Sequence, residues 1–128
     1  MTPSPPAPAG PGPARLLTRR RVWFGFGVVL HLIVLYAPRA PSTGDLPIDK
    51  MVHALIFAEV LWLGARAQVP VLPLTAVLSA HAVISELIQH WLLRGRSGDL
   101  LDTVADLTGV LIVTLVLRLH AARAASPG

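Results

Sequence analysis

The chain contains no cysteine in its 128 residues. Disulfide bonds, thiolate nucleophiles and iron–sulfur clusters are therefore excluded, and cysteine usage does not indicate a redox compartment. Charged residues are also scarce. They make up 14% of the chain, against roughly 25% in globular proteins. Hydrophobic residues account for 53%, and the mean hydropathy is +0.62. With this composition, we expect apolar surface to face lipid.

Several familiar motifs are missing as well. The sequence has no zinc-ligand motif, no phosphate-binding loop and no nucleophile elbow, so we predict neither a bound metal nor a cofactor. The net charge is +4 and the isoelectric point is about 11.1, a balance common in nucleic-acid-binding proteins. Here, however, the arginines lie at the ends of apolar runs, where they can anchor helices to anionic headgroups. We therefore expect membrane lipids, and no nucleic acid, as partners.

Four apolar runs are long enough to cross a membrane. They predict an all-α fold, an integral membrane bundle of four transmembrane helices at about residues 22–37, 50–67, 69–93 and 100–119. The first run lacks a small-x-small cleavage site, which favours a retained helix over a signal peptide. An N-terminal tail (1–21), disordered and rich in Pro, Ala and Gly at its start and then basic, is expected to precede the transmembrane domain (22–119). A short tail (120–128) follows it. Prolines and a glycine in residues 38–48 predict a loop.

The basic residues predict the orientation of the bundle. With four spans, both termini share one side, and that side holds seven basic residues: Arg15, Arg19, Arg20, Arg21, Arg66, Arg118 and Arg123. The other side holds four: Arg39, Lys50, Arg94 and Arg96. Because basic residues are in excess on the cytoplasmic side of membrane proteins, we predict a multi-pass protein of the cell membrane with both termini cytoplasmic.

In this topology the polar residues of the runs gather at the non-cytoplasmic end. They are Asp49, Lys50 and His53 in the second run, Glu86 and Gln89 in the third, and Arg96, Asp99, Asp102 and Asp106 around the start of the fourth. An ionisable group at the membrane centre costs at least about 2.5–3 kcal/mol, so each should face the bundle and have a partner. A purely structural role as helix caps and ion pairs is one interpretation, and Asp99 suits an N-cap.

The carboxylates of Glu86, Asp102 and Asp106 indicate more than ion pairing. Asp102 and Asp106 lie one helical turn apart, and the turn before them brings Glu86 to the same place. Carboxylates stacked in a medium of low dielectric constant repel, so at least one should take up a proton or bind a cation. His53 is one turn from Asp49, and a histidine–carboxylate pair suits a general base. The candidate catalytic residues are therefore His53, Glu86, Asp102 and Asp106.

The other polar residues of the runs are expected to be structural. His31 lies in the middle of the first run, far in sequence from any carboxylate, and His81 is expected to make a structural hydrogen bond. We expect Glu59 to pair with Arg66 or to reach the interface, with a proton relay as the alternative. Gly109 permits close approach of two helices.

Four short segments carry most of these polar residues: Asp49-Lys50-x-x-His53, Glu86-x-x-Gln89, Arg96-x-x-Asp99-x-x-Asp102 and Asp106-x-x-Gly109. Together they resemble the VanZ-like family of small bacterial membrane proteins, over about residues 22–119. Two positions depart from the family: Asp106 stands where an asparagine is usual, and Val113 stands where a second glycine often follows. The resemblance implies a polytopic membrane protein. The founding member of the family is linked to resistance to the glycopeptide teicoplanin.

The first functional hypothesis is a cell-envelope membrane protein that binds a lipid-linked envelope precursor or a lipid headgroup at its outer face, with an effect on glycopeptide susceptibility. Lys50 and Arg96 would hold an anionic group, and Glu86, Gln89 and Asp102 would orient it. The candidate ligand-binding residues are Asp49, Lys50, Gln89, Arg96 and Asp99.

Two alternatives stay open. One is a membrane enzyme that acts on a lipid headgroup, with His53 as the base and Asp102 and Asp106 as acid or cation ligands. The other is a small proton- or cation-coupled carrier, in which Glu59 continues a relay from Asp106. Four spans are few for a carrier unless the chain forms an oligomer.

Overall fold

The described part of the chain forms four α-helices and no strand. The computed structural model describes residues 12–37, 47–92 and 100–126. The helices are α1 (Pro13–Tyr36), α2 (Pro47–Arg66), α3 (Val71–Leu92) and α4 (Leu100–Ala125). The all-α class predicted from the sequence is therefore confirmed.

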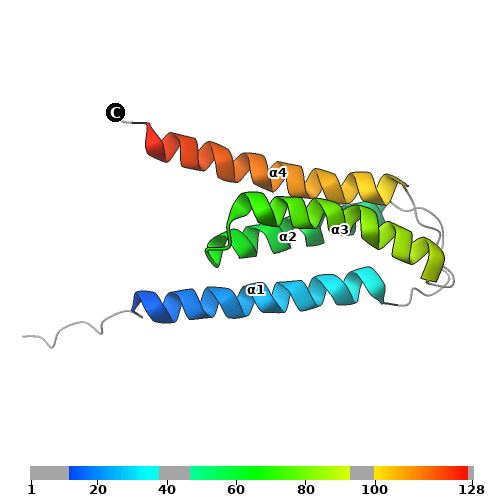
Figure 1. Cartoon of the computed structure of the whole chain (residues 1–128), viewed down its shortest axis with the longest axis horizontal. Coiled ribbons are helices and arrows are strands. Elements are labelled where there is room, and N and C mark those ends of the chain that lie inside the picture. Colours follow the sequence, from blue (N-terminus) through cyan, green and yellow to red (C-terminus); the bar gives the residue numbers. More distant parts are fainter. Residues whose placement is uncertain (1–11, 38–46, 93–99, 127–128) are drawn as a thin grey trace, which may run out of the picture.

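Successive helices run in opposite directions (Figure 1). The end of α1, the start of α2, the end of α3 and the start of α4 meet at one end of the bundle, on the right of Figure 1. Helix α2 contacts all three other helices, and its most extensive contact is with α4. Those of the predicted polar positions that belong to the described residues are therefore brought together there.

A small apolar core surrounds α2. Phe57 and Leu61 of this helix are fully buried, and Leu35 from α1 and Val110 from α4 belong to the same cluster. This core packs the apolar part of α2 that follows its first turns against α1 and α4. Its position leaves the first turns of α2 to the polar residues.

The outer surface of the bundle is largely apolar. Trp23 and Phe26 on α1, Leu72 on α3 and Leu111 on α4 each keep more than half of their surface exposed. Helices α3 and α4 are long and apolar enough to cross a membrane, and only 22% and 33% of their most apolar stretches are buried in the bundle. A core helix of a water-soluble protein would be mostly buried, so these two helices suit contact with lipid. Since two of the described helices meet this criterion, the four-span bundle stays a prediction.

Three helices extend beyond the limits predicted from hydropathy. Helix α2 begins at Pro47, before the predicted start at residue 50, so the last two residues of the predicted loop 38–48 are helical, and residues 38–46 lie outside the described residues.

Helix α1 begins at Pro13, so the basic part of the predicted N-terminal tail is helical. The predicted disordered start of that tail lies almost entirely in residues 1–11, outside the described residues. Pro13 stands at the first helical position, where its fixed φ suits the helix and its missing N–H costs nothing. Helix α4 continues to Ala125, past the predicted end at residue 119. Hydropathy predicts where a helix leaves an apolar medium. It does not predict where the helix ends, because its backbone hydrogen bonds can continue through polar residues beyond that point.

A tight turn joins α2 to α3. Gln68 has a φ of 66°, the left-handed conformation that often ends a helix. The N–H of Val69 donates to the carbonyl of Gly64 at 2.9 Å, and the N–H of Gln68 donates to the carbonyl of Ala65 at 3.1 Å. This pair of bonds is a Schellman motif with a glutamine in the position that favours glycine. It reverses the chain at the end of the bundle opposite the polar residues.

Candidate functional site

Five polar side chains are buried together where α2, α3 and α4 meet. They are His53 from α2, Glu86 and Gln89 from α3, and Asp102 and Asp106 from α4, and none exposes more than 7% of its surface. On α3 and α4 these residues are three and four positions apart, which places each pair on one helical face. Asp49 and Lys50, in the first turns of α2, lie half-buried beside them. We refer to these seven residues as the polar cluster.

The central contact of the cluster joins His53 to Asp106. Nδ1 of His53 lies 3.0 Å from Oδ1 of Asp106, and both side chains are almost completely buried. A neutral imidazole with its proton on Nδ1 donates this hydrogen bond to the carboxylate and leaves Nε2 as a base. Nε2 lies 4.0 Å from Oδ2 of Asp102, which is too long for a direct hydrogen bond. The two ring nitrogens therefore face two different carboxylates of α4.

Lys50 closes the outer side of the cluster. Its Nζ donates a hydrogen bond of 3.2 Å to Oδ1 of Asp102, and its side chain remains 27% exposed. An ammonium group carries a positive charge and three protons, so it can contact an anionic group as well as a carboxylate. Lys50 can therefore neutralise Asp102 and still bind an anionic group at the mouth of the cluster.

Gly109 fixes the distance between α2 and α4 beside the cluster. A Cβ at this position would overlap the carbonyl oxygen of Ala54 and lie 2.9 Å from its carbonyl carbon. Ala54 follows His53 in the chain, and Gly109 is one turn after Asp106. The close helix approach predicted for Gly109 is confirmed, and it allows the His53–Asp106 contact to form.

Two buried polar atoms of the cluster have unused hydrogen-bonding capacity. Oδ2 of Asp106 and Nε2 of Gln89 have no hydrogen-bond partner within the described ranges. A buried polar atom without a partner costs about 1–3 kcal/mol. This cost is offset when a ligand or an ion contacts these atoms.

Two groups of three side chains have the spacing of metal ligands. One consists of Asp49, His53 and Asp102, and the other of His53, Glu86 and Asp106. Within each group, one potential ligand atom from each residue lies within 4.8 Å of the others. Oxygen and imidazole ligands of this kind can hold a divalent cation. The sequence motifs predicted no metal site, because the ligands come from three helices and form no local motif.

The structure assigns His53 a different main partner from the one predicted. The sequence favoured Asp49, one turn earlier on the same helix, whereas the direct hydrogen bond goes to Asp106 on α4. Asp49 is nevertheless within metal-ligand spacing of His53. Two predicted ligand-binding residues, Arg96 and Asp99, lie outside the described residues. The other predicted site residues are all brought together.

A second polar group, which the sequence did not predict, lies between α1 and α3. His81 makes two hydrogen bonds, to Nε2 of His31 at 3.2 Å and to the hydroxyl of Tyr36 at 3.1 Å. The ring of His31 also packs edge-on against Phe57, with ring centroids 4.5 Å apart. The structural hydrogen bond predicted for His81 is therefore confirmed. His31 and Tyr36 are five residues apart on α1, and their nearness in sequence was the one signal that could have suggested this group.

Glu59 does not take part in either cluster. Its side chain is exposed, and within the described residues it forms neither an ion pair with Arg66 nor a hydrogen bond to Asp106. Exposure allows it to extend along the helix toward a polar boundary. The relay predicted to run from Asp106 through Glu59 has no hydrogen-bonded connection in this part of the chain.

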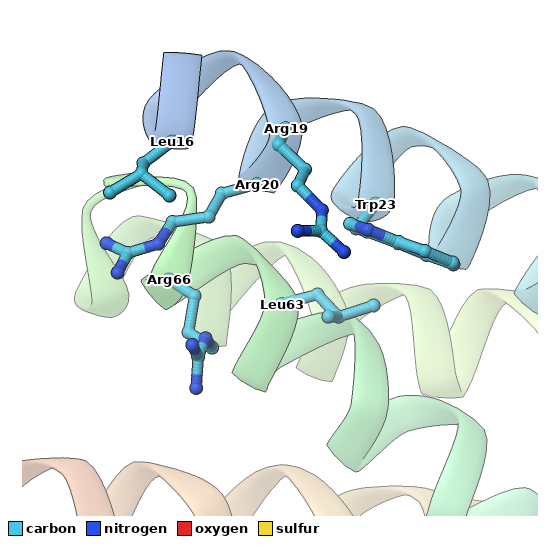
Figure 2. A pocket seen from close by; sticks show the side chains of 6 residues that line it. All are labelled: Leu16, Arg19, Arg20, Trp23, Leu63 and Arg66. Carbon is cyan, nitrogen blue, oxygen red and sulfur yellow. The ribbon is translucent and has the colours of Figure 1, made fainter. Parts of the chain in front are cut away.

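The opposite end of the bundle has a basic pocket of about 290 Å³ between α1 and α2. Figure 2 shows the side chains that line it: Leu16, Arg19, Arg20 and Trp23 come from α1, and Leu63 and Arg66 come from α2. None of the three arginines forms an ion pair with an acid in the described segments. Arginines next to a tryptophan and leucines are typical of the boundary between lipid tails and headgroups.

Comparisons with models of protein families, with curated proteins and with solved structures find no match to this chain.

Proposed function

We propose that the chain is a four-span protein of the cell membrane that binds a lipid headgroup, or the headgroup of a lipid-linked envelope precursor, at the polar cluster. One observation carries this proposal: a set of buried ionisable side chains sits at one end of a bundle whose outer surface is apolar. Ionisable groups inside a membrane bundle are expensive and mark functional sites by default. The end of the bundle is also where a headgroup would lie.

The groups of the cluster fit a headgroup that carries both an amine and a phosphate. Asp49 and Asp102 offer carboxylates to the amine, and the ammonium group of Lys50 offers positive charge and hydrogen bonds to the phosphate. Deeper in the cluster, the amide nitrogen of Gln89 is buried without a partner in the described residues and can donate to a ligand oxygen. Donors and acceptors are therefore arranged from the mouth of the site inward.

The distribution of charge supports an orientation with both termini in the cytoplasm. The basic pocket and Arg118 and Arg123 lie at the end of the bundle opposite the polar cluster (Figure 1). Basic residues next to spans favour the cytoplasmic side, where anionic lipids attract them. The polar cluster then opens to the outer leaflet, where envelope precursors are used.

The resemblance to the VanZ-like family supports the same proposal from the sequence. Asp49, Lys50, His53, Glu86 and Gln89 belong to its pattern, and the structure places all five in the polar cluster. We therefore propose that loss of the protein changes susceptibility to a glycopeptide such as teicoplanin. This consequence depends on binding of an envelope lipid and not on modification of the drug.

Native mass spectrometry of the full chain, purified in a mild detergent from cell membranes, tests the binding proposal. The wild-type protein is expected to retain one lipid species with an amine- or phosphate-bearing headgroup. Lys50→Ala and Gln89→Leu are expected to reduce the retained fraction at least several-fold, because they remove donors from the site. Glu59→Gln is the matched control, since it changes an exposed polar residue of α2 outside the cluster.

Equal lipid retention in Lys50→Ala, Gln89→Leu and Glu59→Gln would contradict the proposal. It would show that the lipids coat the apolar surface without using the cluster.

A second candidate function, an enzyme that acts on the bound headgroup, is favoured by the His53–Asp106 pair. A carboxylate that accepts a hydrogen bond from Nδ1 orients the ring and leaves Nε2 as a general base. His53→Gln is expected to abolish turnover of the co-purified lipid while its retention is kept. Turnover that is absent in the wild-type protein, or unchanged in His53→Gln, would leave binding as the function.

A further inference from the structure

We propose that His53, Glu86 and Asp106 bind a divalent transition-metal ion, of which Zn²⁺ is the best fit. This inference goes beyond the proposed function and does not depend on it, because it concerns the ion alone. The three side chains come from α2, α3 and α4, and all are buried. An ion at this place would connect the three helices that form the site.

The distance between His53 and Asp106 suits two ligands of one ion. Nδ1 and Oδ1 are 3.0 Å apart. Zinc binds nitrogen and oxygen at about 2.0–2.1 Å with tetrahedral angles, so two of its ligands are about 3.3 Å apart. A shift of a few tenths of an ångström therefore replaces the shared proton of the hydrogen bond with a metal ion. When the ion binds Nδ1, the proton of the neutral imidazole moves to Nε2, which faces the carboxylate of Asp102.

The second carboxylate oxygen of Asp106 provides independent support. Asp106 is 0% exposed, and its Oδ2 has no hydrogen-bond partner in the described residues. A fully buried carboxylate that uses one oxygen only is costly, because a charged group keeps a large desolvation penalty unless it is paired. The hydrogen bond from His53 reaches only one oxygen of this carboxylate. A divalent ion bound to the carboxylate would supply the positive charge that the buried group lacks.

The kinds of ligand select the class of metal. An imidazole nitrogen favours zinc and its neighbours in the transition series, whereas calcium and magnesium prefer oxygen ligands only. One histidine and two carboxylates are three protein ligands, and zinc sites with three protein ligands keep a fourth position for water or another ligand. Gln89 lies one turn after Glu86 on α3 and is buried as well.

The alternative group of Asp49, His53 and Asp102 suits an ion less well. Asp102 already accepts a hydrogen bond from the ammonium group of Lys50 at 3.2 Å. A cation at that place would be repelled by Lys50 and would have to displace it. Asp102 is better suited to orient the ring of His53 from the side opposite the ion, because Nε2 of His53 faces Oδ2 of Asp102. Carboxylates placed behind a metal-bound histidine raise its basicity and fix its orientation.

Metal binding to the purified full chain tests the inference. The protein in detergent is stripped with a chelator, given Zn²⁺ alone and desalted, and the bound zinc is measured by inductively coupled plasma mass spectrometry. We expect one ion per chain in the wild-type protein and a rise in its melting temperature. His53→Ala, Glu86→Gln and Asp106→Asn are expected to weaken binding by more than about tenfold, since even partners behind the ligands change affinity by about 10–100-fold.

Three controls make the result specific. Glu59→Gln and His120→Ala remove an exposed acid and an exposed histidine, and they are expected to bind zinc as the wild type does. Asp49→Asn distinguishes the two groups and is also expected to keep the ion. Circular dichroism of each variant confirms its fold. Asp106→Asn keeps an acceptor for His53, and Glu86→Gln provides a second variant on another helix.

Four results would overturn the inference. The first two are the absence of zinc in the wild-type protein and undiminished zinc binding in both Glu86→Gln and Asp106→Asn. The third is loss of zinc from Asp49→Asn while Glu86→Gln retains it. The fourth is displacement of zinc by excess Mg²⁺. Because no lipid is added, none of these results depends on headgroup binding.

Discussion

At the scale of single residues, the two aspartates of α4 have different partners. Asp102 contacts the half-exposed Lys50 at the mouth of the cluster, whereas Asp106 contacts His53 in its interior. They are one helical turn apart, yet each carboxylate is matched to a different group of α2. The deeper residue is therefore the one whose removal leaves a buried partner behind.

Asp106→Ala is expected to destabilise the chelator-treated protein by about 1–3 kcal/mol, because Nδ1 of buried His53 loses its acceptor. Asp106→Asn should cost much less, since the amide oxygen still accepts that hydrogen bond. Thermal unfolding in detergent, followed by circular dichroism, measures both variants. Equal losses for alanine and asparagine would show that the hydrogen bond to His53 contributes little.

At the scale of elements, the approach of α2 and α4 determines the geometry of the site. The contact of Gly109 with the backbone of Ala54 brings His53 and Asp106 to hydrogen-bonding distance. A side chain at this position meets backbone and not the flexible end of another side chain. The two helices must therefore separate if Gly109 is replaced.

Gly109→Ala is expected to destabilise the protein by about 1–3 kcal/mol, the usual cost of an extra methyl group in a tightly packed contact. Zinc binding should weaken with it, because the ligands on α2 and α4 move apart. Gly25→Ala on α1 is the matched control. A Cβ there has no neighbour within 4 Å, and the higher helix propensity of alanine should stabilise α1 by up to about 1 kcal/mol. The same change in melting temperature for both variants would contradict a special role for Gly109.

The turn between α2 and α3 provides a prediction in the opposite direction. Gln68 holds a φ of 66°, a conformation that costs a residue with a Cβ about 1 kcal/mol relative to glycine. Gln68→Gly is therefore expected to stabilise the protein by about 0.5 kcal/mol, after the greater freedom of glycine in the unfolded chain is subtracted. A fall in melting temperature would show that the side chain of Gln68 makes a contact that outweighs the backbone strain.

The sequence predicted which end of each helix is polar but not every contact between helices. Because successive membrane-spanning helices run in opposite directions, the end of each helix lies beside the start of the next. The grouping of Lys50, Glu86 and Asp102 could therefore be predicted from their order along the chain. The partner of His53 depends on how α2 and α4 are rotated and how closely they pack, which Gly109 decides. Hydropathy carries no such information, and the nearer candidate, Asp49, was therefore favoured.

The His31–His81–Tyr36 group was missed for the same reason. His81 is 45 residues from Tyr36 and 50 from His31 in sequence, and it meets both through tertiary packing alone. None stands next to a residue of opposite charge, so each appears in the sequence as an isolated polar residue of an apolar run.

At the scale of the whole molecule, the bundle has two unlike ends and an apolar side. One end holds the polar cluster, and the other holds the basic pocket of α1 and α2 together with the basic end of α4 (Figures 1 and 2). This arrangement fits a membrane with the arginines in the cytoplasmic headgroup layer and the cluster in the outer one. The headgroup proposal rests on this orientation.

Cysteine labelling in intact cells tests this orientation most directly, and the chain has no cysteine of its own to interfere. Ile48→Cys and Leu92→Cys place a thiol at the end of the polar cluster, and Ser126→Cys places one at the opposite end; all three positions are exposed. We predict that a membrane-impermeant maleimide labels the first two in intact cells and labels Ser126→Cys only after the membrane is permeabilised. Labelling of Ser126→Cys alone in intact cells would contradict the account, because it would place the polar cluster in the cytoplasm.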